Sequence, residues 1–172
     1  MPSGKKYDLT FFTATLLEWK PLLTNDTYKD IIVDSLRFHT SNNRIQLNAF
    51  VIMDNHLHLI WHILHPHIRE DVHRSFLGFT AKAIIKHLRN HYPEILTSHY
   101  VNARDREYQI WERNPLSIDI WSEEVLKQKI AYIHNNPVKA GYCVYPEEYK
   151  YSTAALYNSQ PHGWNFVTPC FI

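Results

Sequence analysis

The chain has 172 residues, 45% hydrophobic and 20% charged, which is enough apolar chain for one hydrophobic core and excludes a disordered protein. Its 18 basic and 17 acidic residues give a formal net charge of +1, which excludes the strong positive excess of many DNA-binding domains. Two cysteines, no signal-like start and no apolar run of about 18 residues predict a cytoplasmic protein without a disulfide framework or a membrane partner.

The start of the chain predicts a strand followed by a helix. Aromatic and β-branched residues alternate through YDLTFFTATLL, residues 7–17, which is typical of a strand. After a turn at Pro21, the capping cluster at residues 24–26 leads into apolar residues at helical spacing. We therefore expect a helix over residues 26–38.

Two further strands and a long helix follow. Residues 45–53 alternate in polarity, residues 56–64 form another apolar run, and only the turn residues Asp54 and Asn55 separate them, so an antiparallel hairpin is expected. The helical pattern over residues 69–91 predicts a long helix. Its basic side is made of Lys82, Lys86 and Arg89.

The last third predicts one more strand and one more helix. The strand is expected around residues 108–111. Ser122 is a suitable N-cap for a helix that Pro137 should end, and the tail from Pro146 should wrap the surface. The element order indicates an α+β fold, an antiparallel sheet with helices packed against it. We expect a single domain over residues 1–172, with a core at about 5–145 and a C-terminal tail at 146–172.

A histidine pair in the second strand of the hairpin is the first candidate site. His56 and His58 point to the same side of a strand, where two imidazoles can converge on one metal ion. The alternative is a pair of half-buried histidines bonded to their neighbours, and for the pair alone the two interpretations have about equal weight.

The segment AYIHNNPVKAG is the second candidate. Tyr132 and Asn136 are four residues apart and share one helix face, with Gln128 one turn earlier, so a hydroxyl and an amide oxygen would be presented together. The alternative is a tyrosine at the edge of the core and an asparagine that only ends the helix, which is the more common situation for such residues.

Taken together, the two segments are more specific than either. MDNHLHLIW resembles the His-hydrophobic-His motif of the HUH single-strand endonucleases, and YIHNNPVKAG resembles the tyrosine helix of the REP-associated tyrosine transposases. FFTATLLEW resembles the first strand of that family, AFVIMDNHLHLIW its central hairpin and PEEYKYSTAALY its tail. The resemblance covers most of the chain and implies a ferredoxin-like (RRM-like) antiparallel sheet.

The resemblance also implies an activity and its residues. It makes Tyr132 the nucleophile and His56, His58 and Asn136 the ligands of a divalent metal, Mg²⁺ or Mn²⁺. The substrate would be single-stranded DNA containing a hairpin, cleaved and rejoined through a 5′-phosphotyrosine. Candidate DNA contacts are Asn55, Lys82, Lys86, Arg89 and Lys139, while Trp111, Trp121 and Trp164 could stack on unpaired bases. Asp54 stands where relatives often have proline, and it either alters the turn or offers a further carboxylate.

Other classes of histidine-containing enzyme would need different residues. A histidine-triad hydrolase would need a histidine where the chain has Ile60, and a two-histidine phosphoesterase would need a second such strand, so both are excluded. A relaxase or rolling-circle nickase, and a domesticated protein that binds DNA hairpins without cutting them, stay open. So does the choice between monomer and homodimer. His62, His65 and His67 are given no role.

Overall fold

The computed structural model describes residues 8–170, and Tyr7, where the first strand was expected to begin, lies outside this range. Six elements form the central unit: β1 (Leu9–Thr15), α1 (Asp26–Ser41), β2 (Ile45–Ile52), β3 (His56–Ile63), α2 (Arg69–His91) and β6 (Leu116–Ile120). The strands pair in the order β2-β3-β1-β6, and every neighbouring pair is antiparallel. This βαββαβ order is the ferredoxin-like arrangement, so the predicted fold class is confirmed.

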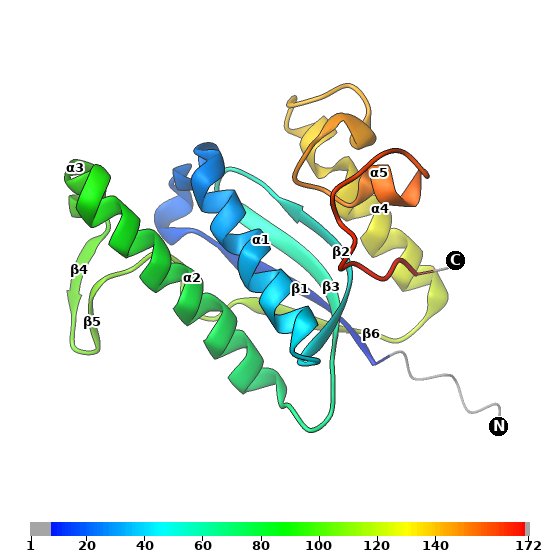
Figure 1. The fold of residues 1–172 in the computed structure, drawn as a ribbon, viewed down its shortest axis with the longest axis horizontal. Helices are drawn as coiled ribbons and strands as arrows, with labels where there is room; N and C mark the ends of the chain where they lie inside the picture. The colour runs from blue at the N-terminus through cyan, green and yellow to red at the C-terminus, as the bar shows by residue number, and fades with distance from the viewer. Residues whose placement is uncertain (1–7, 171–172) are drawn as a thin grey trace.

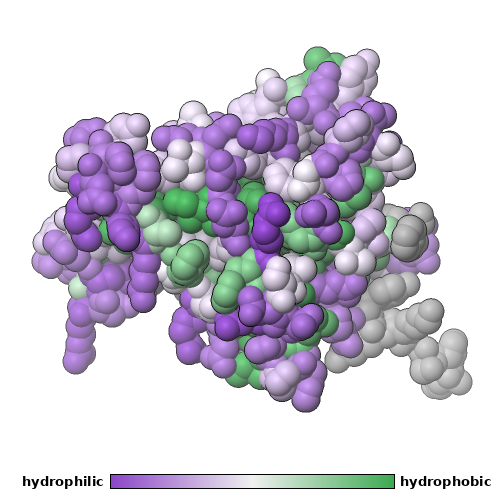
Figure 2. Space-filling model, in the orientation of Figure 1, coloured by the Kyte–Doolittle hydropathy of each residue, from purple (hydrophilic) through white to green (hydrophobic). Residues whose placement is uncertain are grey.

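Helices cover both faces of the sheet (Figure 1). On one face, α1 and α2 lie side by side and bury residues such as Leu36 and Phe76 against Phe12 and Trp61 of the sheet. On the other face lies α4 (Glu123–Lys139), whose apolar stripe packs on a separate, smaller core. The outer surface of the α1 and α2 layer is mostly hydrophilic (Figure 2), as expected for helices with one buried side.

The register of the sheet decides which side chains share a face. His58 pairs with Thr13 on β1 and with Val51 on β2, and two residues along the strand Ile60 pairs with Phe11 and Ala49. Directly opposed residues of an antiparallel pair point to the same side. The face that carries the histidines is therefore the face on which α4 packs.

The helix starts follow the capping signals of the sequence. The side chain of Asn25 accepts from the backbone N–H of Thr27 at the start of α1, and Ser122 accepts from the backbone N–H of Val125 at the start of α4. The prediction for α2 is confirmed at both ends, whereas α1 continues three residues past the expected Phe38 to Ser41.

The prediction that Pro137 ends the last helix is wrong, because α4 runs through it to Lys139. Proline removes only its own N–H, and this one falls in the last turn of the helix. The carbonyls around it keep their partners, since Ala140 donates to Asn136 and Tyr142 donates to Pro137. Pro137 is buried, and the helix continues beyond it to Lys139.

The prediction of a strand at residues 108–111 is also wrong. β5 (Arg106–Tyr108) ends where that strand should begin and pairs only with β4 (Tyr100–Ala103), in a separate hairpin after α3 (Pro93–Thr97). Trp111 makes a single bridge to Leu16. The fourth strand of the main sheet is β6, an edge strand whose short LSIDI pattern has an exposed Leu116 and one fully buried residue, Ile120.

The tail runs along β2 and adds to the core. Two 3-10 turns, η1 (Leu17–Trp19) and η2 (Leu22–Thr24), lie between β1 and α1, and the tail holds η3 (Pro146–Glu148) and α5 (Ala154–Tyr157). Thr153 accepts from the backbone N–H of Phe50, and Thr168 donates to the carbonyl of Leu47. Trp164 of the tail is buried, so the tail does more than cover the surface. Over residues 8–170, none of the helices combines the length and the apolar character needed to cross a bilayer.

Candidate active site

The histidine pair lies at the start of β3, on the α4 side of the sheet. The ring centroids of His56 and His58 are 4.9 Å apart. Their neighbours across the β1 ladder are Thr15 and Thr13. Two imidazoles at this separation on one face can approach a common ion, as the strand spacing predicts.

His58 is the more buried of the two and has one nitrogen to spare. The hydroxyl of Thr13 lies 2.7 Å from its Nδ1, while its Nε2 is buried and has no hydrogen-bond partner among residues 8–170. Burial lowers the pKa of His58 to about 3, with smaller contributions from His56 and the ammonium of Lys129. The ring is therefore neutral at ordinary pH, which is the form that binds metal ions.

His56 is hydrogen-bonded to the amide of Asn55. Its Nδ1 lies 2.7 Å from Oδ1 of Asn55. Because a carbonyl oxygen only accepts, Nδ1 carries the proton and Nε2 keeps its lone pair. Burial lowers the pKa of His56, and a hydrogen bond with the side chain of Asn136 partly opposes this shift. The structure thus brings Asn136 to the histidine pair, as the sequence predicts.

Tyr132 is placed over the same site by the packing of α4. The buried side chains of Ile130 and Ile133 lie in the core beside Phe11 and Ile60, which fixes the helix against the sheet. The Tyr132 ring then lies 5.2 Å from the His58 ring, centroid to centroid. Tyr132 remains 44% exposed, so part of this residue is open to solvent.

Two residues near this cluster were not selected from the sequence. The ammonium of Lys129 lies 4.5 Å from the centroid of the Phe11 ring and 5.9 Å from that of Tyr132. Trp19, 61% exposed, has its ring centroid 6.0 Å from that of His56. The spacing of Lys129, three residues before Tyr132, was the available signal for the lysine, whereas the place of Trp19 depends on the 3-10 turn after β1.

Of the expected DNA contacts, the structure brings together only some. Asn55 contacts His56, and the ammonium of Lys139 lies 5.9 Å from the centroid of the Tyr132 ring. The basic residues of α2 are exposed, but α2 covers the opposite face of the sheet, so they do not join this site: Lys82, Lys86 and Arg89. Helical periodicity gives the exposed side of a helix but not the face of the sheet on which the helix packs.

The three tryptophans considered for base stacking also differ in their exposure to solvent. Trp111 is buried and donates to Thr80, and Trp164 is buried and donates to the carbonyl of Ser152, so both are core residues with a satisfied N–H. Trp121 is 68% exposed. Of the three tryptophans considered for stacking, only Trp121 is therefore available at the surface.

Asp54 is held by its own partners. Its carboxylate accepts from the ammonium of Lys29 at 2.9 Å and from the hydroxyl of Tyr142 at 3.0 Å. Lys29 is buried against the rings of Tyr149 and Tyr151. Both carboxylate oxygens of Asp54 accept hydrogen bonds. The structure therefore supports a role for Asp54 in shaping the turn before β3 rather than in offering a further carboxylate to a metal.

The donor set of the cluster suits a divalent cation. Over residues 8–170, no group of three or more His, Cys, Asp and Glu side chains is placed to hold a metal ion. His56, His58 and Asn136 supply two neutral imidazoles and an amide oxygen, and the partnerless Nε2 of His58 is a buried donor atom. Nitrogen with oxygen donors suits Mn²⁺ well, while Mg²⁺ usually prefers oxygen and retains several waters.

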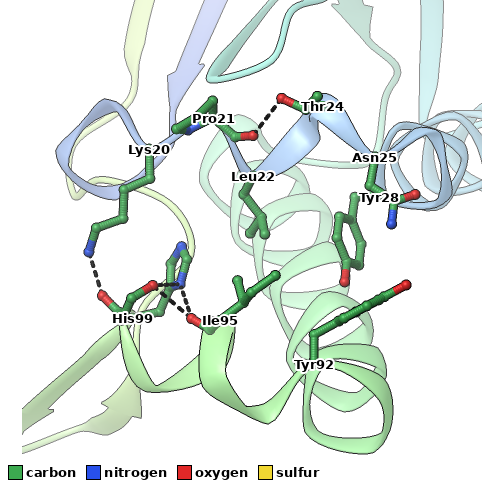
Figure 3. Close-up of a pocket in the computed structure, with 10 residues that line it drawn as sticks. Lys20, Pro21, Leu22, Thr24, Asn25, Tyr28, Tyr92, Ile95 and His99 are labelled. Carbon is green, nitrogen blue, oxygen red and sulfur yellow. Dashed lines mark hydrogen bonds between the residues drawn. The ribbon is translucent and has the colours of Figure 1, made fainter.

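A groove away from this cluster lies between η2 and α3 (Figure 3). It has a volume of about 650 Å³. Leu22 and Ile95 point toward one another across it, with Tyr28 and Tyr92 beside them. None of the four side chains of the candidate active site, His56, His58, Tyr132 and Asn136, lines this groove.

Comparison with solved structures defines the fold further. The structure of a REP-associated tyrosine transposase bound to a REP hairpin aligns with 100% of this chain and 98% of its own, with a TM-score of 0.66 and 17% identity. A "putative transposase" from Deinococcus radiodurans aligns with 78% of this chain and 97% of its own, with a TM-score of 0.52 and 20% identity. The chain therefore has the same fold as these two structures. No family model and no curated protein matches its sequence.

Proposed function

We propose that the chain is a metal-dependent tyrosine transposase that cleaves and rejoins single-stranded DNA. The observation that carries the proposal is the position of Tyr132, whose ring lies 5.2 Å from His58 while the histidine pair and Asn136 gather beneath it. A nucleophile, a donor set for a cation and an exposed approach thus occur at one place.

The reaction would be a transfer of one phosphodiester. The phenol oxygen of Tyr132 forms a bond to phosphorus as the bond from phosphorus to the 3′ oxygen breaks, and the phenol proton passes through water to the 3′ oxygen. A 5′-phosphotyrosine and a free 3′ hydroxyl result, and the reverse attack rejoins a strand. A divalent cation held by His56, His58 and Asn136 would polarise the phosphate and offset the charge that develops on it.

The proposed substrate is single-stranded DNA with a hairpin. The related structure described above is bound to a REP hairpin, which supports a hairpin partner for this chain. A protein with a net charge of +1 can neutralise few DNA phosphates. Its affinity for plain duplex should therefore be low, and its binding should depend only weakly on salt. A clear preference for blunt duplex over a hairpin with single-stranded flanks would contradict this part of the proposal.

The decisive experiment is covalent capture with Tyr132→Phe as the test variant. Wild-type protein incubated with hairpin DNA and Mn²⁺ should give an adduct on a denaturing gel, and peptide mapping should place the nucleotide on Tyr132. The variant keeps the ring and loses only the hydroxyl, so it should bind DNA and fold normally but form no adduct.

Two other outcomes separate the alternatives. Tight binding of hairpins by wild-type protein without any adduct, under Mg²⁺ or Mn²⁺, would favour a domesticated binding protein. Nicking without rejoining would favour a relaxase or rolling-circle nickase. An adduct on another tyrosine would contradict the assignment of α4 as the catalytic helix.

A further inference from the structure

The face of α4 that carries Tyr132 also carries two lysines. Lys129, Tyr132, Asn136 and Lys139 are separated by three, four and three residues, so they form one stripe along the helix. Both ammonium groups lie 5.9 Å from the centroid of the Tyr132 ring. The candidate nucleophile is therefore flanked by a positive charge on each side.

Lys129 is the more enclosed of the two. Its ammonium lies over the Phe11 ring at 4.5 Å, and that ring stacks on His58 with centroids 5.3 Å apart and planes 21° apart. Lys129 is half-buried, whereas Lys139 is exposed near the end of the helix. The charge of Lys129 thus lies beside the Tyr132 ring and over the Phe11 ring that stacks on His58, where water is partly excluded and electrostatic effects are stronger.

The charge of Lys129 is also unshared. Elsewhere on the same helix, Lys127 pairs with Glu123 at 2.7 Å. Across the described range 8–170, neither Lys129 nor Lys139 has a carboxylate oxygen within ion-pair distance. An ammonium held by aromatic rings and without a counter-ion is available to an anion that enters the site.

We infer that Lys129 is a catalytic residue that contacts the scissile phosphate and stabilises the transition state of the Tyr132 attack; this rests on the proposed function. As the phenol oxygen bonds to phosphorus and the 3′ oxygen departs, negative charge spreads over the phosphoryl oxygens. A fixed cation beside them stabilises that state more than the bound substrate. Lys139, in water at the helix end, binds the strand without this selectivity.

The test compares four proteins: wild type, Lys129→Met, Lys129→Arg and Lys127→Met. Single-turnover rates of adduct formation are measured with Mn²⁺ and hairpin DNA at saturating protein. Binding is measured separately by fluorescence anisotropy, with each lysine variant combined with Tyr132→Phe so that no strand is cut. Thermal melting by circular dichroism checks that each protein is folded.

We expect Lys129→Met to lower the adduct rate about 100-fold, the usual effect of losing one transition-state donor, and to weaken binding only a few-fold. The arginine variant keeps the charge and should recover most of the rate, while Lys127→Met, with its charge already shared, should match wild type. Suppose that wild type forms the adduct and folded Lys129→Met forms it equally fast, or more slowly only in proportion to its weaker binding. The role of Lys129 is then refuted, while the proposed function still stands. If wild type forms no adduct, the proposed function fails and this inference fails with it.

Discussion

The hydroxyl of Thr13 lies 2.7 Å from Nδ1 of His58, across the ladder between β1 and β3. A partner on one ring nitrogen fixes the orientation of the imidazole and leaves the other nitrogen for a metal. Thr13 therefore orients the imidazole of His58, with which it pairs across the sheet.

Thr13→Val keeps the side-chain shape and removes this hydrogen bond. We expect affinity for Mn²⁺ to fall about 10-fold to 100-fold, the usual effect of losing an outer partner of a metal-binding histidine. Titration calorimetry of the protein without DNA measures it, with Thr15→Val, at the position opposite His56, for comparison. Equal affinity in Thr13→Val and wild type would show that the hydroxyl does not orient the ring.

The pair of Lys29 and Asp54 should dominate the stability of the turn before His56. The Lys29 side chain is 6% exposed and that of Asp54 is 23% exposed, so removal of the carboxylate leaves a nearly buried ammonium unpaired. We expect Asp54→Ala to lower the free energy of unfolding by about 3 kcal/mol, measured by urea denaturation. Lys29→Met combined with Asp54→Ala should cost less than Asp54→Ala alone, and the opposite order would contradict this account.

Trp19 should contribute to DNA binding and little to folding. It is 61% exposed beside His56, and stacking of a base on an aromatic ring contributes about 1–3 kcal/mol. Trp19→Ala should weaken binding of hairpin DNA with single-stranded flanks about tenfold in anisotropy measurements. Trp121→Ala, which removes an equally exposed tryptophan with no ring contact to the histidine pair, serves as the matched control. A similar loss in both variants would mean that neither ring has a specific place at the site.

Stability should fall in mild acid, and His39 is one of the buried histidines responsible. Burial lowers the pKa of His39 to about 4, with Arg44 and His67 acting in the same direction. An unfolded histidine titrates near 6.5, so between pH 6.5 and 4 the unfolded chain binds the proton and the folded chain does not. This contribution to stability is complete above pH 6.5 and is lost as the pH falls toward 4, by about 1.4 kcal/mol per pH unit at most. His39→Leu should flatten the dependence in urea denaturation at pH 7, 6 and 5, and an unchanged slope would contradict it.

The sequence was sufficient for the parts of the site that depend on periodicity. Alternation along β3 placed His56 and His58 together, and helical spacing placed Tyr132 with Asn136. These are properties of one element at a time, and a strand or a helix enforces them wherever it packs.

What could not be predicted depends on how the elements assemble. The lysines and arginine of α2 lie on the far side of the sheet, since one sequence cannot say which face a helix covers. β6 was missed because an edge strand of five residues has little buried area to impose a pattern. Pro137 was assigned to a helix end because proline disfavours a helical conformation in the residue before it, whereas here Pro137 is buried inside α4, which ends two residues later at Lys139.

The two hydrophobic cores on either side of the sheet differ in size. The residues of the proposed site are divided between the sheet and α4. β3 contributes side chains to both cores, whereas α4 packs only against the smaller core, around Phe11 and Ile60. Local opening needs less free energy where fewer apolar side chains are buried. In native-state hydrogen exchange, the amides around Tyr132 and Asn136 should therefore exchange before those around His58, so that the proposed site joins a more readily released helix to a better protected strand.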